Sequence, residues 1–293
     1  MRDDCINPKI NARARHFIRK RRVAQAFRAA GFDQMAEHLD DCQEVNRQII
    51  CLNCGHVHYV EQRCRQRTCP LCSFRESRRR GDWIKRMCHG MAFPKMLTLT
   101  MPRWTQVPGL GIDYIRACFN LLRKQPIFSK VKGGVYQIEL KRKEGGWHIH
   151  MHVILDCPFL PYQKILAAWS SILGVPCSRI DIRAAKTDAQ MFYVAKYAAK
   201  AADYEGEISH VVEWWQATKG KRLFAGFGSW YNQEPPAGDA DSNPHSGKFP
   251  CPNCGAEDSC VSGESVGFIV GRDAAPLYRQ ALSAAGPPRI SKW

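Results

Sequence analysis

The chain contains the run Trp147-His148-Ile149-His150-Met151-His152-Val153-Ile154-Leu155, in which histidine alternates with apolar residues. Successive side chains of a β-strand point to opposite faces of its sheet. On a strand, the three imidazoles would therefore share one face, and Ile149, Met151 and Val153 would share the other. The run predicts a half-buried strand, with a packed core on one side and a row of histidines on the other.

A second strand is expected over residues 134–140, joined to the first through the polar, glycine-containing stretch 141–146. The two strands would pair, and Glu139 and Gln137 would share one face of the second strand. Strands are also expected over residues 95–101 and 178–183. Helices are expected over residues 11–30, 34–48, 112–124 and 162–173, and an arginine-rich helix is expected to end near residue 87.

The histidine row has the chemistry of a divalent-metal site. Two neutral imidazoles on one strand face can hold an ion, and a carboxylate completes a mixed nitrogen and oxygen ligand set. His150, His152 and His148 are the candidate imidazoles, and Glu139 is the candidate carboxylate. The alternative is a row of ordinary surface histidines, since a lone histidine in a strand is usually structural.

The segment Tyr193-Val194-Ala195-Lys196-Tyr197-Ala198-Ala199-Lys200 is expected to lie on a helix that runs from Thr187 or Asp188 to about residue 203. Tyrosines four residues apart share one helix face. Ionising a tyrosine of pKa about 10 at pH 7 costs about 4 kcal/mol, which a metal and a neighbouring lysine can partly offset. Tyr193 and Tyr197 are thus candidate nucleophiles beside Lys196 and Lys200, although a tyrosine stripe is more often part of a core.

The composition favours a nucleic-acid partner. The chain of 293 residues has a formal net charge of +16 and a pI of about 9.4, which attracts polyanions. No membrane span or signal peptide is recognised, so a cytoplasmic location is expected. In a reducing cytoplasm, the 14 cysteines are better interpreted as metal ligands and buried thiols than as disulfides.

Five cysteines between residues 51 and 72 predict a structural zinc site. Two Cys-x2-Cys pairs, Cys51/Cys54 and Cys69/Cys72, supply four thiolates, and Cys64 is the alternative ligand. The site is expected to hold basic side chains towards DNA phosphates. The arginines expected to bind DNA are Arg63, Arg65, Arg67, Arg75, Arg78 and Arg79.

A second zinc site is half-complete near the C-terminus. Cys251 and Cys254 form one pair, with Cys260 and His245 as candidate completions. Residues 233–250 are rich in Pro, Gly, Ser and Asp and predict a flexible linker before this tail.

Taken together, these motifs resemble the HUH endonucleases. His150-Met151-His152 resembles their His-hydrophobe-His motif, and Leu97-Thr98-Leu99-Thr100 resembles their first motif. Tyr193 to Lys200 resembles the two-tyrosine motif of rolling-circle replication initiators of the phage gene A type. The zinc segment is similar to one that precedes the catalytic domain in some plasmid initiators.

The resemblance implies an α+β fold of the RRM or ferredoxin-like kind, with a central antiparallel sheet, flanking helices and the histidines on a central strand. It implies that His150 and His152 bind Mg²⁺ or Mn²⁺, with Glu139 as a third ligand, and that Tyr193 and Tyr197 are nucleophiles. One tyrosine would nick the origin strand and stay on the 5′ phosphate. The implied partners are single-stranded or supercoiled origin DNA and the helicase and replication machinery of a bacterial host.

Two other functions remain open: a two-tyrosine HUH transposase, and a non-catalytic zinc-ribbon DNA-binding regulator. Family transposases tend to carry arginine where Lys196 stands, which favours the initiator. The expected organisation is a basic helical segment (1–48), a zinc-binding module (49–75), a catalytic domain (76–232), and a flexible linker with a cysteine-containing tail (233–293).

Overall fold

The structure is a computed structural model and describes residues 12–176, 179–185, 187, 210–233, 251–256 and 260–267. The chain forms two compact units. Met1–Ser73 and Ala237–Trp293 make up one unit, which we call the split unit, and Phe74–Pro236 makes up the other, which we call the sheet unit. The residues expected to be a separate tail therefore belong to the same unit as the N-terminal segment.

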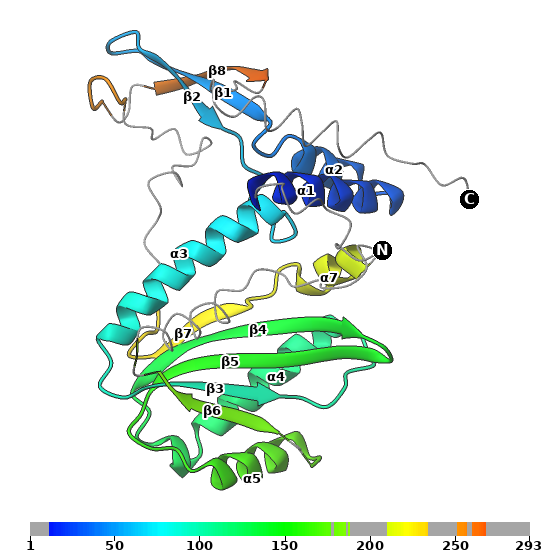
Figure 1. Ribbon diagram of the computed structural model, residues 1–293, viewed down its shortest axis with the longest axis vertical. Coiled ribbons are helices and arrows are strands. Elements are labelled where there is room, and N and C mark those ends of the chain that lie inside the picture. Colours follow the sequence, from blue (N-terminus) through cyan, green and yellow to red (C-terminus); the bar gives the residue numbers. More distant parts are fainter. Residues whose placement is uncertain are drawn as a thin grey trace. The chain divides into compact units, whose positions relative to one another are not determined.

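The sheet unit is built on a five-stranded antiparallel sheet with the strand order β6-β3-β5-β4-β7 (Figure 1). The histidine run lies on the middle strand, β5. Gly145, with a φ of +76°, lies in the turn between β4 and β5, where the left-handed backbone favours glycine. The strands are β3 (Pro94–Thr100), β4 (Gly133–Lys143), β5 (Gly146–Asp156), β6 (Ile180–Ala184) and β7 (Phe224–Gly228).

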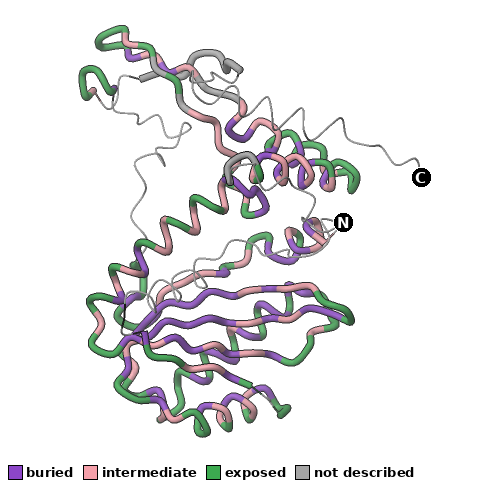
Figure 2. The backbone as a smooth tube through the Cα atoms, viewed as in Figure 1, coloured by how far each residue is buried: buried purple, intermediate pink, exposed green. Residues whose placement is uncertain are grey.

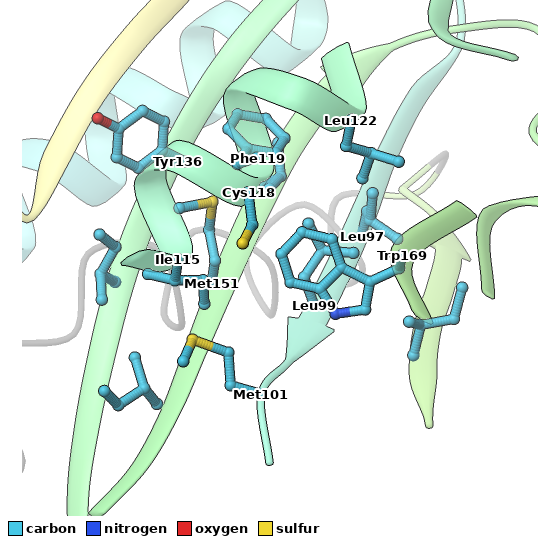
Figure 3. Packing of buried hydrophobic residues seen from close by; sticks show 14 of the residues in the cluster. Leu97, Leu99, Met101, Ile115, Cys118, Phe119, Leu122, Tyr136, Met151 and Trp169 are labelled. Atoms are coloured by element: carbon cyan, nitrogen blue, oxygen red, sulfur yellow. The ribbon is translucent and has the colours of Figure 1, made fainter. Parts of the chain in front are cut away.

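One face of this sheet carries the main hydrophobic core. Leu97 and Leu99 of β3 and Met151 of β5 are fully buried there, against residues of α4 (Pro108–Arg123) and α5 (Tyr162–Leu173) (Figure 3). Trp169 of α5 is also fully buried, and its indole N–H donates a hydrogen bond of 2.9 Å to the backbone carbonyl of Thr100. A short 3₁₀ helix, η2 (Pro126–Phe128), and α7 (His210–Thr218) add Phe128 and Trp214 to this core.

Helix α3 (Pro70–His89) packs on the opposite face of the sheet. Trp83 and Ile84 of the helix form a second buried cluster with Met96, Val135 and Ile154. These contacts lie at one end of the face. The polar residues of the same face lie further along the strands. Both central strands, β4 and β5, are buried over most of their length (Figure 2).

In its described residues, the split unit has helices α1 and α2 and a three-stranded antiparallel sheet of order β2-β1-β8. The buried ammonium of Lys20 on α1 donates hydrogen bonds to the carbonyls of Asp40 and Cys42 and to Glu44, which fixes the chain after α2. The described elements of the split unit are α1 (Ala12–Ala29), α2 (Asp33–Asp40), β1 (Val45–Cys51), β2 (Val57–Glu61) and β8 (Cys260–Gly267).

The α+β class, the antiparallel sheet and the central histidine strand are confirmed. The helix expected over residues 34–48 is wrong in its second half, since α2 ends at Asp40 and β1 begins at Val45. Gln43, with a φ of +61°, turns the chain between them, and the residues of β1 pair with both β2 and β8. The strands β2, β7 and β8 and the helix α7 were not predicted.

No helix among the described residues has both the length and the apolar character needed to cross a membrane.

Candidate active site

The sheet face opposite the main core carries a polar patch in register across three strands. His150 and His152 of β5 lie on this face, because Ile149 and Met151 are buried on the other. On β3, Thr100 is paired with His150 and Thr98 with His152. On β4, Glu139 is paired with His150 and Gln137 with His152. The register therefore brings the predicted carboxylate beside the predicted imidazoles.

Both imidazoles are held by threonine hydroxyls at Nδ1. Thr98 Oγ1 lies 3.1 Å from His152 Nδ1, and Thr100 Oγ1 lies 3.2 Å from His150 Nδ1. A hydroxyl both donates and accepts, so it can serve either neutral tautomer of the ring. In the tautomer that binds a metal, Nδ1–H donates to the threonine and Nε2 offers its lone pair. These contacts give the threonines of the Leu-Thr-Leu-Thr segment a role that the sequence did not assign.

Glu139 is poised between an imidazole and an ammonium group. Its Oε2 lies 3.1 Å from Nε2 of His152, and its Oε1 lies 3.5 Å from Nζ of Lys141. Adjacent ligands of an octahedral Mg²⁺ ion, each about 2.1 Å from the metal, are about 3.0 Å apart. The His152–Glu139 pair thus already has the spacing of two neighbouring ligands.

The donor set fits a divalent ion that accepts both nitrogen and oxygen ligands. The rings of His150 and His152 are tilted by 29° to one another, with centroids 6.5 Å apart. Within the described part of the chain, only cysteine sets bring three or more ligand atoms within 4.8 Å of one another. An ion would therefore have to draw His150 towards the His152–Glu139 pair.

His150 is set up as a neutral ligand. Burial lowers the pKa of His150 to about 4, although Glu139 opposes this shift. Burial also lowers the pKa of His148, with Lys143 and Arg103 contributing. An imidazole that is neutral at pH 7 does not need to lose a proton before it binds a metal.

A cleft of about 290 Å³ opens beside these groups. Sequence reasoning did not single out two of its charged lining residues, Arg179 and Asp181. Asp181 is paired with Thr98 across β3 and β6 and makes an ion pair of 2.8 Å with Arg183. The only signal in the sequence was the alternation of charged and apolar residues on this short strand. The described residues that line the cleft are Met96, Thr98, Thr100, Glu139, His150, His152, Arg179, Ile180 and Asp181.

The structure separates His148 from this cleft. Among the described residues, the cleft is lined by His150 and His152 but not by His148. The Nε2 atom of His148 is buried and has no hydrogen-bond partner among the described residues. The arrangement favours His150 and His152 as the ligand pair, with His148 as their neighbour at a ring distance of 6.2 Å.

The predicted nucleophiles Tyr193 and Tyr197, with Lys196 and Lys200, lie outside the described residues. Their place relative to the histidines stays a prediction.

Helix α3 presents several of the arginines expected to contact DNA. Arg75 and Arg78 are exposed, and Arg78 lies over the ring of Phe74 at 6.0 Å. Arg79 is half-buried and forms an ion pair of 2.8 Å with Glu76. The exposed guanidinium groups remain suitable for phosphate contacts.

Arg80 was not expected at the site, yet it contacts the sheet. Its guanidinium donates to Glu76 at 2.6 Å, lies 4.7 Å from the ring of Phe224, and reaches Oε1 of Gln137 at 3.5 Å. Since Gln137 is the cross-strand neighbour of His152, Arg80 brings positive charge to the histidine face.

In the split unit, Arg65 and Arg67 are exposed in the loop between Cys64 and Cys69. Arg63 is more enclosed and lies 3.9 Å from Glu61. Arg65 and Arg67 are therefore the more accessible of the three.

Eight of the described cysteines form two groups of four, and the zinc site expected between residues 51 and 72 is wrong in its ligand pairing. Cys69 and Cys72 do not lie with Cys51 and Cys54; they lie with Cys64 and Cys42. The sulfur of Cys42 lies 3.4 Å from that of Cys72 and 3.7 Å from that of Cys69. The hydrogen bond from Cys42 lowers the pKa of Cys72, which suits a thiolate ligand. Cys42 has no Cys-x2-Cys partner, so nothing in its local sequence marked it as a ligand.

Cys51 and Cys54 instead meet Cys251 and Cys254. The Cys251/Cys254 pair expected at the C-terminus is thus joined by Cys51 and Cys54 of the N-terminal segment. The side chain of Cys260 and all of His245 lie outside what the structure describes. The backbone N–H of Ala256 donates to the sulfur of Cys254 and lowers its pKa to about 6. Each of the two groups could hold one metal ion.

A family model described as replication protein, Rep_1, matches residues 56–243, which is more than half of the chain. The chain belongs to the Rep_1 replication protein family. The Rep_1 match includes the histidine strand, the threonines of β3 and residues 193–200. The resemblance to rolling-circle replication initiators is confirmed at the level of this family.

A distantly related protein supports the same family. The protein named "Protein rep" of Staphylococcus aureus is 21% identical over 167 residues, which cover 50% of this Rep_1 chain and 73% of that protein. No solved structure matches the chain.

The threonine contacts predict the behaviour of substitutions on β3. Thr98→Val leaves Nδ1 of His152 without its hydroxyl partner, and we expect Mn²⁺ affinity to fall at least about tenfold, as for other partners of metal-binding histidines. Thr98→Ser should restore most of it. Titration calorimetry with Mn²⁺ measures the effect, and Thr105→Val, at an exposed position outside the cleft, is the control. Equal affinities for Thr98→Val and wild type would contradict the assigned role.

The partly buried His150 predicts a pH dependence of stability in the metal-free protein. Its pKa is about 4 in the folded state against 6.5 ordinarily, so the unfolded chain binds the proton more tightly. The stabilisation is complete above pH 6.5 and is lost as the pH falls towards 4. Urea unfolding in a chelator at pH 7 and pH 4.5 should show a smaller loss for His150→Gln than for wild type. Equal losses would contradict this.

Proposed function

We propose that this protein is a rolling-circle replication initiator of a plasmid or phage that nicks and rejoins one strand of its origin DNA. The observation that carries the proposal is the patch of Thr98, Thr100, His150, His152 and Glu139, held in register across three strands of a Rep_1 protein. This patch combines two imidazoles with a carboxylate beside an open cleft. Such a ligand set suits metal-assisted cleavage of a phosphodiester bond.

In this proposal, His150, His152 and Glu139 hold Mg²⁺ or Mn²⁺. The bound ion would polarise the scissile phosphate. Thr98 and Thr100 fix the orientation of the two rings through their Nδ1 atoms. Lys141 lies 3.5 Å from Glu139 and helps to hold the carboxylate in place.

The nucleophiles are Tyr193 and Tyr197. One phenol loses its proton and attacks phosphorus; a tyrosyl O–P bond forms and the bond from phosphorus to the 3′ oxygen breaks. The 3′ oxygen takes up a proton and becomes the primer end, while the protein stays on the 5′ phosphate. Lys196 and Lys200 would favour the ionised phenol. The product is still a phosphodiester, so the second tyrosine or a 3′ hydroxyl can reverse the reaction without ATP.

Basic side chains of both units bind the DNA strand. Arg75, Arg78 and Arg79 on α3, with Arg63, Arg65 and Arg67, would neutralise phosphates, so binding should weaken steeply with salt. Unwinding would fall to a helicase of the bacterial host. The cellular location that follows from this role is the cytoplasm.

The group Cys42, Cys64, Cys69 and Cys72 is proposed to hold a structural zinc ion. Its sulfurs are 3.4 to 3.8 Å apart in the contacts that Cys72 makes with Cys42 and Cys64. In a zinc tetrahedron with bonds of about 2.3 Å, neighbouring sulfurs are about 3.8 Å apart. Zinc here would fix the first turn of α3, which contains Cys72.

The direct test is a covalent adduct on single-stranded origin DNA in Mn²⁺. The strand is labelled on the 3′ side of the nick, and denaturing electrophoresis should show label on the protein. Tyr193→Phe combined with Tyr197→Phe should abolish the adduct, because no phenol remains to attack. His150→Ala with His152→Ala should lower its rate at least about 100-fold.

Tyr231→Phe, at an exposed phenol of the sheet unit, is the matched control and should form the adduct normally. An adduct that survives the double tyrosine substitution would show that the nucleophiles are misassigned. DNA binding by wild type without any adduct, over all the origin strands of the replicon, would favour a non-catalytic regulator.

A further inference from the structure

Two short segments, residues 51–56 and 251–256, fold in the same way although 200 positions separate them. Each reads Cys-x-Asn-Cys-Gly. In the first, the N–H of Gly55 donates to the carbonyl of Cys51 at 2.8 Å, and the N–H of Cys51 donates to the carbonyl of His56 at 2.9 Å. In the second, the same two bonds recur at 2.8 and 2.9 Å. Gly55 and Gly255 have φ values of +70° and +71°.

The two segments direct backbone N–H groups at their own sulfurs in the same pattern. The first sulfur of each pair accepts from the N–H groups two and three positions later. The second sulfur accepts from the N–H two positions later, which belongs to His56 in one segment and to Ala256 in the other. Such N–H groups stabilise sulfur as thiolate, which is the form that binds metals.

The four sulfurs lie together, and each cysteine of one segment contacts a cysteine of the other at nearly the same distance. The Cys51 and Cys254 sulfurs are 3.7 Å apart, and those of Cys54 and Cys251 are 3.6 Å apart. These distances are far beyond a disulfide bond of about 2.05 Å but close to the edge of a zinc–sulfur tetrahedron, about 3.8 Å.

Two asparagines complete the symmetry. Asn53 donates to the sulfur of Cys254, and Asn253 donates to the sulfur of Cys54, both at 3.6 Å. Each segment thus supports a sulfur of the other segment. These reciprocal contacts indicate that the two turns form one site and are not merely adjacent on the surface.

Among the residues whose burial is described, the apolar core at this junction is small. Its buried members are Ile49, Cys51 and Cys251, with Ala256 packed against them. The strand β8 that follows the second segment pairs with β1, with Cys260 beside Cys51 in the register. A metal commonly supplies stability in small modules, and an ion at the four sulfurs would help to hold β8 beside β1.

We propose that one zinc ion, held by Cys51, Cys54, Cys251 and Cys254, fastens the C-terminal segment to the β1–β2 hairpin. The ion closes a discontinuous module, in whose sequence the whole sheet unit Phe74–Pro236 is inserted. Four thiolates in a tetrahedron select a thiophilic ion, and zinc is the usual occupant of such a structural site. The inference is independent of the proposed nicking chemistry.

The test cuts the chain between the two parts of the split unit. A specific protease recognition sequence is inserted after residue 240 of the full-length protein, and complete cleavage is verified on a denaturing gel. In zinc, the C-terminal fragment should co-elute with the rest of the protein on gel filtration. After zinc is removed with a thiol-blocking reagent and a chelator, it should elute separately.

Metal content gives the second measurement. Cys251→Ser with Cys254→Ser should lower zinc by one ion per chain and release the cleaved fragment even in zinc. Cys118→Ala, which removes a buried thiol of the main core, is the control and should leave both zinc content and co-elution unchanged. The proposal is overturned if the fragment separates from zinc-loaded protein, stays bound after zinc is removed, or if the double variant keeps its full zinc content. Iron in place of zinc in the purified protein would also overturn the assignment of the ion.

Discussion

The register between β3 and β5 is the constraint on which both the core and the site depend. Leu97 and Leu99 point into the main core on one face, and Thr98 and Thr100 reach the histidines on the other. Since side chains alternate along a strand, a slip of one residue would expose the leucines and bury the imidazoles. The packing that stabilises the fold therefore also holds the two rings in position. A site of this kind does not need loops to order it, because its parts stand on the most buried strands of the unit.

Much of this could be predicted from the sequence because the signals are local. A period of two over residues 147–155 was enough to predict the strand and the face of its histidines. The expected strand over residues 134–140, with its short connection, then brought Glu139 beside them. The partner of each imidazole at Nδ1 was not predictable in the same way, since it depends on which residues of β3 lie opposite. Asp181 and Arg179 were missed for the same reason: their importance comes from a strand pairing that only the folded chain reveals.

The cysteines show where sequence proximity misleads. Cys51/Cys54 and Cys69/Cys72 are close in the chain and have the spacing of one zinc site, yet each pair is completed by other residues. Cys42 lies in a turn held by the buried Lys20, and Cys251 and Cys254 arrive from beyond the sheet unit. The same non-local pairing, of β1 with β8, explains why the helix expected to reach residue 48 stops at Asp40. The described residues of the two units thus differ: the sheet unit has a broad apolar core, and the split unit has two clusters of thiols.

The central claim is that the histidine face of the sheet binds the ion that acts on DNA beside the two phenols. The most direct measurement is the anomalous scattering of manganese in crystals of the protein with Mn²⁺. The account predicts one peak at about 2 Å from Nε2 of His150, Nε2 of His152 and the carboxylate of Glu139, with Tyr193 or Tyr197 on the same side of the sheet. An empty histidine face in the presence of Mn²⁺, or both phenols on the opposite side of the sheet, would contradict it.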